Sequence, residues 1–481
     1  MRVSARSGLV ALVFGLAIAA APAVQARELP EAKPARVGMS AERLQRLTDH
    51  MNQAVADGVM VGGLGLVARD GKVVYQQTYG LADREPERPM TEDTIFRIYS
   101  MSKPITAVAV LMLYEEGHFF LNDPVARYIP ELADLEVAVS TADGGNTRMV
   151  SDGTVSRTEG SGDASQAGKT RAPRRQPTIR DLLTHTAGFT YGVFGNTEVD
   201  RMYREAGLLA DDATLEDFVT RLGGIPLQYD PGTRWHYSVA VDVQGRLVEA
   251  VSGMKFGDFL EQRIFAPLGM VDTSFVVPDD KWDRVAELYS PAGTPEDTAA
   301  AFQSASTATE LVEANKALDE GYRPGARFES GGGGLMSTAS DYLRFSQMLL
   351  NGGELDGVRL LSPKTVELMT VNHLGDIPMG FGRDGVGFGL GVAVALDQGE
   401  IGELGSPGEY NWGGAAGTRF WVDPEEDLAA QGAEALMRAA AAGFHADIRE
   451  AFAFGILDGR RWDEYIATFD LQVSDLPRVL V

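Results

Sequence analysis

Ser100 and Lys103 stand three residues apart in the stretch FRIYSMSKPITAV, residues 96–108. A serine hydroxyl becomes a nucleophile when a neighbouring base takes its proton, and a desolvated lysine can be that base. The pattern from Ser102 to Gly117 predicts a helix, and residues i and i+3 share one helix face. The helix start also offers free N–H groups and a positive dipole to a developing oxyanion. The spacing therefore indicates a nucleophile and its partner, with a capping serine beside a solvated lysine as the alternative.

The same Ser-x-x-Lys spacing occurs a second time, at Ser252-Gly253-Met254-Lys255. This copy follows a helical pattern that runs from Val239 to Ser252, and a Ser-Gly pair is common where a helix stops. We expect the second copy to be structural. Its existence shows that the spacing alone carries little information, so the surrounding sequence must decide.

Five motifs in chain order supply that context. They are FRIYSMSKPITA, TIRDLLTHTAGF, WHYSVAVDVQGRLVEAVSG, PLGMVDTSF and GGGGLMSTASDYLRF. Together they resemble the serine β-lactamase and penicillin-binding-protein superfamily, and within it the class C-like serine hydrolases that include the family VIII carboxylesterases. The resemblance runs from about Ser40 to about Asp427. It implies an α/β (α+β) fold of the β-lactamase type, with an antiparallel sheet flanked by helices and a mostly helical second domain.

The resemblance also implies roles for individual residues. Ser100 matches the nucleophile, Lys103 its partner, and Tyr237 in HYSV the tyrosine of the second motif. Many relatives carry an asparagine at the third position of that motif, whereas this chain has Val239. Tyr237 would hydrogen-bond between Ser100 and Lys103 and would act with Lys103 as the base system. The division of the proton between Lys103 and Tyr237 stays open.

The third motif of the superfamily matches Trp412-Gly413-Gly414, where β-lactamases carry Lys-Thr-Gly. By the same resemblance, the backbone N–H groups of Ser100 and Ala415 would form the oxyanion hole. We expect Trp412, Gly413 and Gly414 to contact substrate. Arg419, nearby in GTRFW, is a further candidate because it could bind a carboxylate as the lysine of Lys-Thr-Gly does.

Two other features are expected to be structural. His185, in LLTHTAG, is a lone histidine between two threonines, and the resemblance treats this stretch as structural. The run Gly331–Gly334 lacks the Gly-Lys-Ser/Thr that a phosphate loop requires, so a tight wall near the site is the better interpretation. The chain contains no G-x-S-x-G motif, which argues against an α/β-hydrolase fold.

The first 26 residues have the pattern of a secretory signal peptide, with cleavage expected after Ala26. Arg2 and Arg6 precede a short apolar run, which is too short for a comfortable membrane span. These residues carry no negative charge, so their removal takes the net charge from −25 to −27. We therefore expect a secreted or periplasmic protein without a stable membrane span, and so acidic a chain would repel nucleic acid.

The residues that usually hold metals or cofactors are scarce. The chain has no cysteine, which excludes disulfides, thiolate nucleophiles and Cys-ligated zinc. Its six histidines show neither i, i+3 or i+4 spacing nor an HExxH motif. We expect no metal and no cofactor.

The order of helical and strand patterns suggests a sheet domain built from both ends of the chain and interrupted by a mostly helical domain. We predict a helix from Ser40, a hairpin at Asp70-Gly71, further helices around 178–188 and within GGGGLMSTASDYLRFSQMLLNGG, and strands at FGLGVAVAL and GTRFWVDP. The domain boundaries that follow are a signal peptide at 1–26, a sheet domain at 27–98 and 325–428, a helical domain at 99–324 and a tail at 429–481.

Two segments of this plan have unusual composition. Residues 140–176 are rich in Gly, Ser, Thr, Asp and Arg, and are predicted to be a mobile insertion. From Ala429 the chain reads AAQGAEALMRAAAAGFHADIREAF, which predicts an atypical helical tail where the superfamily usually adds a strand and a closing helix.

Three functions are compatible with these observations. The first is an exported serine hydrolase that cleaves small carboxylic esters through an acyl-enzyme. The second is a peptidase or amidase of the same fold, including D,D-peptidase or β-lactamase activity on a peptide-like substrate. The third is a non-enzymatic binding or sensor protein, against which the presence of Ser100, Lys103 and Tyr237 argues. The oligomeric state and the natural substrate stay open.

Overall fold

The structure is a computed structural model. It describes residues 28–139, 148–149, 155–156, 168–210, 212–293, 310–380, 384–433 and 453–455. The predicted signal peptide at 1–26, most of the predicted insertion at 140–176 and most of the tail lie outside the described residues. No helix in the described part is long and apolar enough to cross a membrane.

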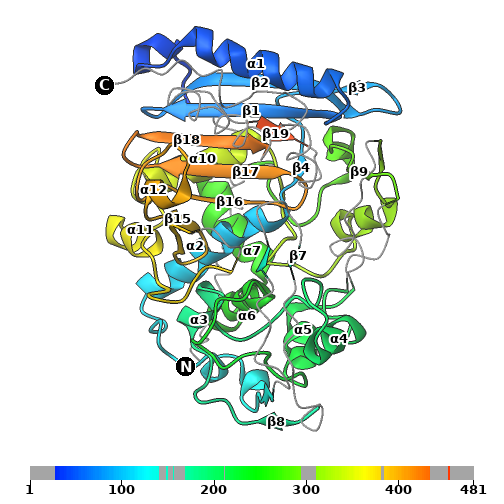
Figure 1. Ribbon diagram of the computed structural model, residues 1–481, viewed down its shortest axis with the longest axis vertical. Coiled ribbons are helices and arrows are strands. Elements are labelled where there is room, and N and C mark those ends of the chain that lie inside the picture. The colour runs from blue at the N-terminus through cyan, green and yellow to red at the C-terminus, as the bar shows by residue number, and fades with distance from the viewer. Residues whose placement is uncertain are drawn as a thin grey trace, which may run out of the picture.

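A nine-stranded antiparallel sheet dominates the described part of the chain (Figure 1). Its strand order is β14-β15-β16-β17-β18-β1-β2-β3, and β19 also pairs with β1. The strands are β1 (Gly62–Arg69), β2 (Lys72–Asp83), β3 (Arg88–Pro89), β14 (Val386–Phe388), β15 (Ala393–Ala395), β16 (Tyr410–Gly413), β17 (Thr418–Asp423), β18 (Leu428–Ala433) and β19 (Ala453–Gly455). Both ends of the chain therefore contribute to one sheet, as the order of sequence patterns predicts.

The hairpin at Asp70-Gly71 is confirmed. Arg69 pairs with Lys72 across a two-residue loop, and both loop residues have positive φ, 52° and 68°. Two positive φ angles define the type I′ turn, whose twist matches that of the strands, and glycine adopts this conformation without a steric cost.

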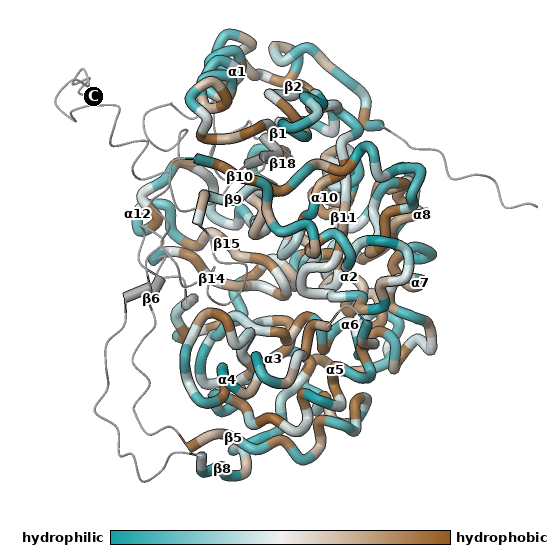
Figure 2. The backbone as a smooth tube through the Cα atoms, turned by 90° about the vertical axis from the view of Figure 1, so that its right-hand side faces the viewer, coloured by the Kyte–Doolittle hydropathy of each residue, from teal (hydrophilic) through white to brown (hydrophobic). Residues whose placement is uncertain are grey.

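Two layers of helix cover the two faces of the sheet. On one face lies α1 (Ala41–Ala56), capped by Ser40 as predicted, with Leu44, Leu47 and Met51 packed on residues that include Val67 and Trp421. In Figure 2, α1 carries hydrophilic and hydrophobic residues alike, as expected of a helix with one face on a sheet. The other face of the sheet meets α10 (Ala339–Leu350), which contacts β1, β17 and β18.

The helical part of the molecule gathers at the end opposite α1 (Figure 1). The helix α2 (Ser102–Glu115) is buried along nearly its whole length and packs against α6 (Ala240–Ser252). The other α-helices are α3 (Ile179–Leu183), α4 (Glu198–Glu205), α5 (Leu215–Leu222), α7 (Phe256–Leu260), α8 (Ala266–Leu268), α11 (Pro363–Met369) and α12 (Gln398–Ile401).

Short elements complete the described part of the chain. The 3-10 helices are η1 (Pro34–Val37), η2 (Tyr99–Met101), η3 (Val125–Arg127), η4 (Pro130–Leu132), η7 (Asp279–Arg284) and η8 (Lys316–Tyr322), and η6 (Glu261–Phe265) is a π-helical turn. The short strand pairs are β4 (Phe96–Arg97) with β11 (Met336–Ser337), β5 (Val137–Ala138) with β8 (Thr170–Arg171), β6 (Arg148–Met149) with β7 (Val155–Ser156), β9 (Tyr289–Pro291) with β10 (Leu311–Glu313), and β12 (Glu354–Leu355) with β13 (Val358–Arg359).

Two expectations for the last part of the described chain are wrong in detail. The tail does not begin as a helix, because residues 428–433 form β18 between β17 and β1. Alanine is a poor strand former in isolation, but here a central place in the sheet overrides local propensity. FGLGVAVAL is not one strand, since β14 and β15 form a hairpin that turns at Gly391, where φ is 92°.

The predicted insertion at 140–176 is shorter than its composition suggests. Residues 170–171 form β8, and Arg171 makes a bidentate pair with Asp230. Arg175 makes a second bidentate pair with Asp181. Polar composition alone predicts that the whole segment is solvated. The ion pairs of Arg171 and Arg175 instead attach its C-terminal end to the helical part of the molecule.

Candidate active site

Ser100 sits in the turn η2 between β4 and α2, as the motif predicts. The residue before it, Tyr99, has a φ of 40°, a left-handed conformation that is strained for a bulky aromatic residue. Three hydrogen bonds fix this turn. Ile98 donates its N–H to Leu335, Tyr342 Oη donates to the Met101 carbonyl at 2.8 Å, and Met101 N–H bonds back to Ile98. The nucleophile candidate is therefore held on rigid backbone.

Lys103 is almost completely buried in the first turn of α2, with 1% of its surface exposed. Its Nζ donates a hydrogen bond of 3.1 Å to Ser100 Oγ and one of 2.5 Å to the carbonyl of Gly332. The i, i+3 spacing thus brings the two side chains together. A solvated surface lysine, the alternative left open by the sequence, is excluded by this burial.

Tyr237 lies next to Lys103, in the loop that leads into α6. The Lys103 Nζ is 4.6 Å from the centre of the Tyr237 ring. The indole Nε1 of Trp412 donates a hydrogen bond of 3.3 Å to Tyr237 Oη. Aromatic neighbours enclose the ring, with centroid distances between 4.8 and 6.0 Å. They are His185, Tyr191, Phe194, Trp235 and Trp412.

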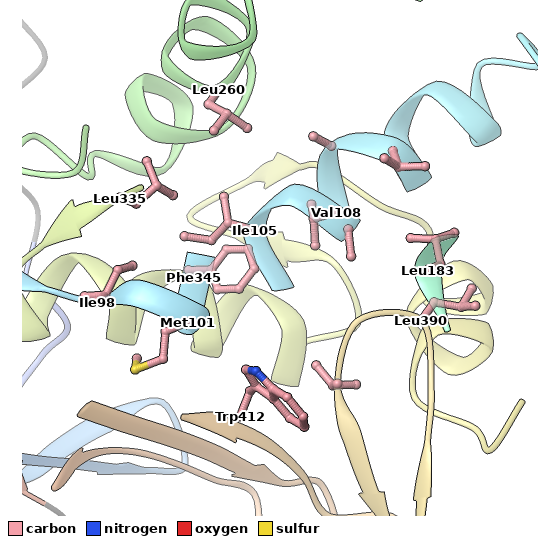
Figure 3. Packing of buried hydrophobic residues seen from close by; sticks show 14 of the residues in the cluster. Ile98, Met101, Ile105, Val108, Leu183, Leu260, Leu335, Phe345, Leu390 and Trp412 are labelled. Atoms are coloured by element: carbon pink, nitrogen blue, oxygen red, sulfur yellow. The ribbon is translucent and has the colours of Figure 1, made fainter. Parts of the chain in front are cut away.

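Trp412 and Gly413 end the strand β16 beside the nucleophile turn, and Gly414 follows directly. Figure 3 shows Trp412 on the strand side, below the segment that carries Ile98 and Met101. A Cβ on Gly414 would lie 2.3 Å from the Ile98 carbonyl oxygen, so only glycine allows this close approach. Ala415 follows, exposed, and within the described residues its N–H has no hydrogen-bond partner.

Arg419 is not brought to this cluster. It pairs with Gly413 across β16 and β17, whereas Trp412 pairs with Phe420. Because side chains alternate between the two faces of a sheet, Arg419 points away from the face that carries Trp412. Its guanidinium donates to Asn411 Oδ1 at 3.1 Å. The proposed carboxylate-binding role of Arg419 therefore has no geometric support.

The second Ser-x-x-Lys copy is used for structure, as expected. Ser252 Oγ donates to the Val248 carbonyl at 2.6 Å. Gly253 ends α6 with a φ of 72°, and Lys255 is exposed. The two copies share a spacing but not an environment.

His185 has the structural role expected from the sequence. It is fully buried and its ring packs 4.8 Å from that of Tyr237. Burial lowers the pKa of His185 well below its usual value, and the positive charge of Lys103 acts in the same direction. His185 is therefore neutral, and its ring packs against Tyr237 to hold that side chain in place. No residue spacing in the sequence predicts this contact.

Asp242 and Tyr191 also lie at the site, although no sequence motif points to them. Asp242, on α6, is fully buried beside the glycine run. The Tyr191 ring lies 5.3 Å from Lys103 Nζ. Each could have been noted only as a polar residue within a few positions of a motif. No group of three or more metal-ligating side chains comes together in the described part of the chain.

Comparisons with known proteins agree with this fold. The family model described as Beta-lactamase matches residues 47–432, most of the chain. This chain belongs to the beta-lactamase family, and the fold expected from the sequence is confirmed.

Individual relatives narrow the class. The chain is 33% identical over 387 residues to Protein Rv1367c of Mycobacterium tuberculosis, covering 77% of this chain and 84% of the relative. It is 31% identical over 386 residues to Esterase EstB of Burkholderia gladioli, covering 79% and 86%. The solved structure of EstCE1, described as a hydrolase with promiscuous acyltransferase activity, superposes with a TM-score of 0.64 at 26% identity, covering 85% of this chain and 98% of that one. The chain is therefore a serine hydrolase of the beta-lactamase family that resembles the family VIII esterases.

Proposed function

We propose that this serine hydrolase cleaves carboxylic esters through an acyl-enzyme formed on Ser100, with Lys103 and Tyr237 as the base system. One observation carries the proposal. A buried lysine bonds to Ser100 Oγ at 3.1 Å, and the Tyr237 ring lies against the same ammonium. The similarity to Esterase EstB supports ester chemistry.

Acylation follows from the positions of these groups. Ser100 Oγ attacks the ester carbonyl carbon, and its proton passes to the Lys103–Tyr237 pair. The C–O bond to the alcohol then breaks, and the departing alkoxide takes the proton back. Lys103, held by Ser100 and Gly332, balances negative charge that develops on either partner.

The tetrahedral intermediate needs donors for its oxyanion. The backbone N–H groups of Ser100 and Ala415 are the proposed pair. The exposed Ala415 N–H has no partner among the described residues, which leaves it available to substrate. In deacylation the same base pair takes a proton from water, the hydroxide attacks the acyl carbon, and Ser100 leaves with the proton.

The surroundings favour a neutral ester over an anionic lactam or peptide. Arg419 is the single basic residue between Tyr410 and Asp423, and it faces away from Trp412. The aromatic side chains around Tyr237 offer an apolar wall to a small acyl group. Peptidase or β-lactamase activity remains the second candidate, on the strength of the shared fold.

Fluorophosphonate labelling, run beside turnover of p-nitrophenyl butyrate, tests the proposal. We expect covalent labelling and hydrolysis in the wild type, and loss of both in Ser100→Ala. Ser252→Ala is the matched control, because it alters the structural copy of the motif and should retain both activities. Equal losses in the two variants would refute Ser100 as the nucleophile. Labelling without turnover in the wild type would point to a non-enzymatic sensor.

Export is proposed with this function, on the signal-peptide pattern of residues 1–26. N-terminal sequencing of protein recovered from the periplasm or medium of a bacterial host should begin at Arg27. Protein that stays in the cytoplasm with an intact N-terminus would contradict export without affecting the catalytic proposal.

A further inference from the structure

Asp242 is a fully buried carboxylate next to the Ser100–Lys103 pair. It lies in the first turn of α6, five residues after Tyr237. Its Oδ1 accepts hydrogen bonds from Ser330 Oγ at 2.5 Å and from the Gly332 N–H at 3.1 Å. Its Oδ2 has no hydrogen-bond partner among the described residues. A buried carboxylate is costly unless something compensates its charge, so the reason for its presence is a mechanistic question.

The segment that Asp242 holds is the glycine run Gly331–Gly334. A Cβ on Gly331 would lie 2.6 Å from the Val241 carbonyl oxygen, and one on Gly332 would lie 2.7 Å from Tyr191 Oη and 2.9 Å from Asp242 Oδ2. Thr106, on α2, donates to the Gly331 carbonyl at 2.9 Å. The glycines therefore allow the loop to lie flat between α2 and α6, with its peptide groups facing side chains on both.

The backbone of a single residue, Gly332, links Asp242 to Lys103. The Gly332 N–H points to Asp242 Oδ1, and the Gly332 carbonyl accepts the 2.5 Å hydrogen bond from Lys103 Nζ. The Asp242 carboxylate thus holds Gly332 in place, and the carbonyl of Gly332 in turn holds the Lys103 ammonium. The arrangement also puts a negative group close enough to interact with the buried positive charge of Lys103.

We propose that Asp242 is a positioning residue for the base system, acting through the Gly332 backbone to hold Lys103 against Ser100 and compensating the charge of Lys103. This inference rests on the proposed function, because it assigns Lys103 and Tyr237 to proton transfer. It gives the glycine run a purpose, which is to carry the link between the carboxylate and the ammonium.

Burial raises the pKa of Asp242 above its usual value. The hydrogen bond from Ser330 and the positive charge of Lys103 oppose that shift in part. Tyr191, Tyr237 and His185 are the other ionisable groups around Lys103. The helices α2, α3, α5 and α7 pack against α6, and their remaining ionisable residues are Tyr114, Glu115, Arg180, Asp181, Glu216, Asp217, Arg221 and Asp258.

These remaining groups do not replace Lys103 as the counter-charge. Asp181 is buried, but it is paired with Arg175 at 2.5 Å. Arg180, Glu216 and Asp258 are exposed, where water screens their charges. Lys103 is the cation among the groups that act on the Asp242 carboxyl.

The sign of the effect follows from the charge. A nearby negative charge favours the state in which the Lys103–Tyr237 pair retains its extra proton. The pair must lose that proton before it can act as a base. Neutralising Asp242 should therefore let the pair lose the proton at lower pH, and the acid limb of the pH–rate profile should move to lower pH by roughly one unit.

The experiment measures the pH dependence of fluorophosphonate labelling at Ser100, beside kcat/KM for an ester. Asp242→Asn keeps a carbonyl oxygen for Ser330 and Gly332 but removes the charge, so the acid limb should move down while the fold persists. Asp341→Asn is the matched control, because Asp341 is another buried carboxylate in the first turn of a helix, bonded to the Asp272 N–H and Thr273 Oγ1. It should leave the acid limb in place. An unmoved limb in Asp242→Asn, or equal movement in Asp341→Asn, would overturn the proposal.

Ser330→Ala separates position from charge. It removes a donor to Asp242 but keeps the carboxylate, so we expect slower labelling with an unchanged acid limb. Should Asp242→Asn not fold, an unaltered labelling rate in Ser330→Ala would overturn the positioning role. Labelling without ester turnover in the wild type would defeat the proposed function alone, because the labelling profile still reports on Asp242. Absence of labelling at Ser100 would defeat both.

Discussion

Trp412 Nε1 donates a hydrogen bond of 3.3 Å to Tyr237 Oη, and so joins the sheet to the candidate base. The two rings also lie in contact, with centroids 5.6 Å apart. By sequence resemblance, Trp412 matches the lysine of the Lys-Thr-Gly motif that β-lactamases carry. The hydrogen bond indicates that the tryptophan orients the tyrosine and supplies an N–H to its oxygen, without a charge for a substrate carboxylate.

Trp412→Phe should lower kcat while leaving the ring contacts in place. A hydrogen bond to a group that becomes charged contributes about 1.5–3 kcal/mol, so the loss should be roughly ten- to a hundredfold. Trp421→Phe is the control, because Trp421 lies on the other face of the sheet, against α1. Equal losses of kcat in the two variants would show that the effect comes from sheet packing.

Neutral esters should be better substrates than β-lactams. A charge-assisted pair with the carboxylate of a lactam contributes about 1.5–3 kcal/mol, and Arg419 does not face the cluster to make one. The acidic chain also repels anionic substrates. We expect kcat/KM for p-nitrophenyl acetate or butyrate to exceed that for nitrocefin and for a D-Ala-D-Ala peptide on one preparation. The opposite order would replace the esterase proposal with the peptidase or lactamase alternative.

Tyr237→Phe should reduce the rate by roughly 10²–10⁴, the range for one general base. The variant keeps the ring that packs on His185 and removes only the hydroxyl. Tyr191→Phe provides the comparison, because its ring also lies over Lys103, at 5.3 Å, yet Trp412 bonds to Tyr237. Single-turnover hydrolysis should show the larger loss in Tyr237→Phe, and unchanged turnover in that variant would move the base role elsewhere.

The sequence predicts the parts of the site that lie near one another in the chain. Ser100 and Lys103 share a helix turn, so their contact follows from helix geometry alone. Tyr237 and Trp412 could be placed only through resemblance, because their meeting depends on how α6 and the sheet pack around α2.

What the sequence could not provide is the direction of side chains across the sheet and the partners of buried charges. Arg419 is seven residues from Trp412, yet strand alternation turns it to the opposite face. Asp242 reads as an ordinary acidic residue near the start of a helix until its contacts with Ser330 and Gly332 are known. The alanine-rich start of the tail predicts a helix, yet these residues form β18 because pairing with β17 and β1 stabilises the strand.

Limited proteolysis should cut first within residues 140–167 and leave esterase activity largely intact. This part of the predicted insertion lies outside the described residues apart from β6 and β7, and its composition cannot bury a core. Residues 168–176 should resist cleavage, because Arg171 and Arg175 are bound to Asp230 and Asp181. Mass spectrometry of the fragments and an activity assay on the nicked protein check both points. Early cleavage at 168–176, or protection of 140–167, would contradict the expectation.

The folded protein should lose stability as the pH falls from about 6.5 toward 4, in part because of His236. His236 precedes Tyr237 in the chain, and its Nε2 lies 3.3 Å from Thr190 Oγ1 with its ring edge-on to Tyr229. Burial lowers the pKa of His236 to about 4 from 6.5. Between these values the unfolded chain binds a proton that the folded chain does not, so stability is present at higher pH and is lost as the pH falls.

The size of that loss can be isolated with His236→Gln. From pH 7 to pH 5, wild-type His236 should contribute a decrease of about 2 kcal/mol in the free energy of unfolding, at about 1.4 kcal/mol for each pKa unit. The glutamine variant cannot take up the proton, so its stability should fall by that much less across the same interval. His118→Gln is the comparison, because it makes the same replacement at an exposed histidine whose Nε2 lies 3.3 Å from Glu116 Oε2. Urea unfolding of the three proteins at both pH values measures the difference. Parallel losses in wild type and His236→Gln would mean that His236 does not resist protonation in the fold, and that acid destabilisation arises at other buried groups.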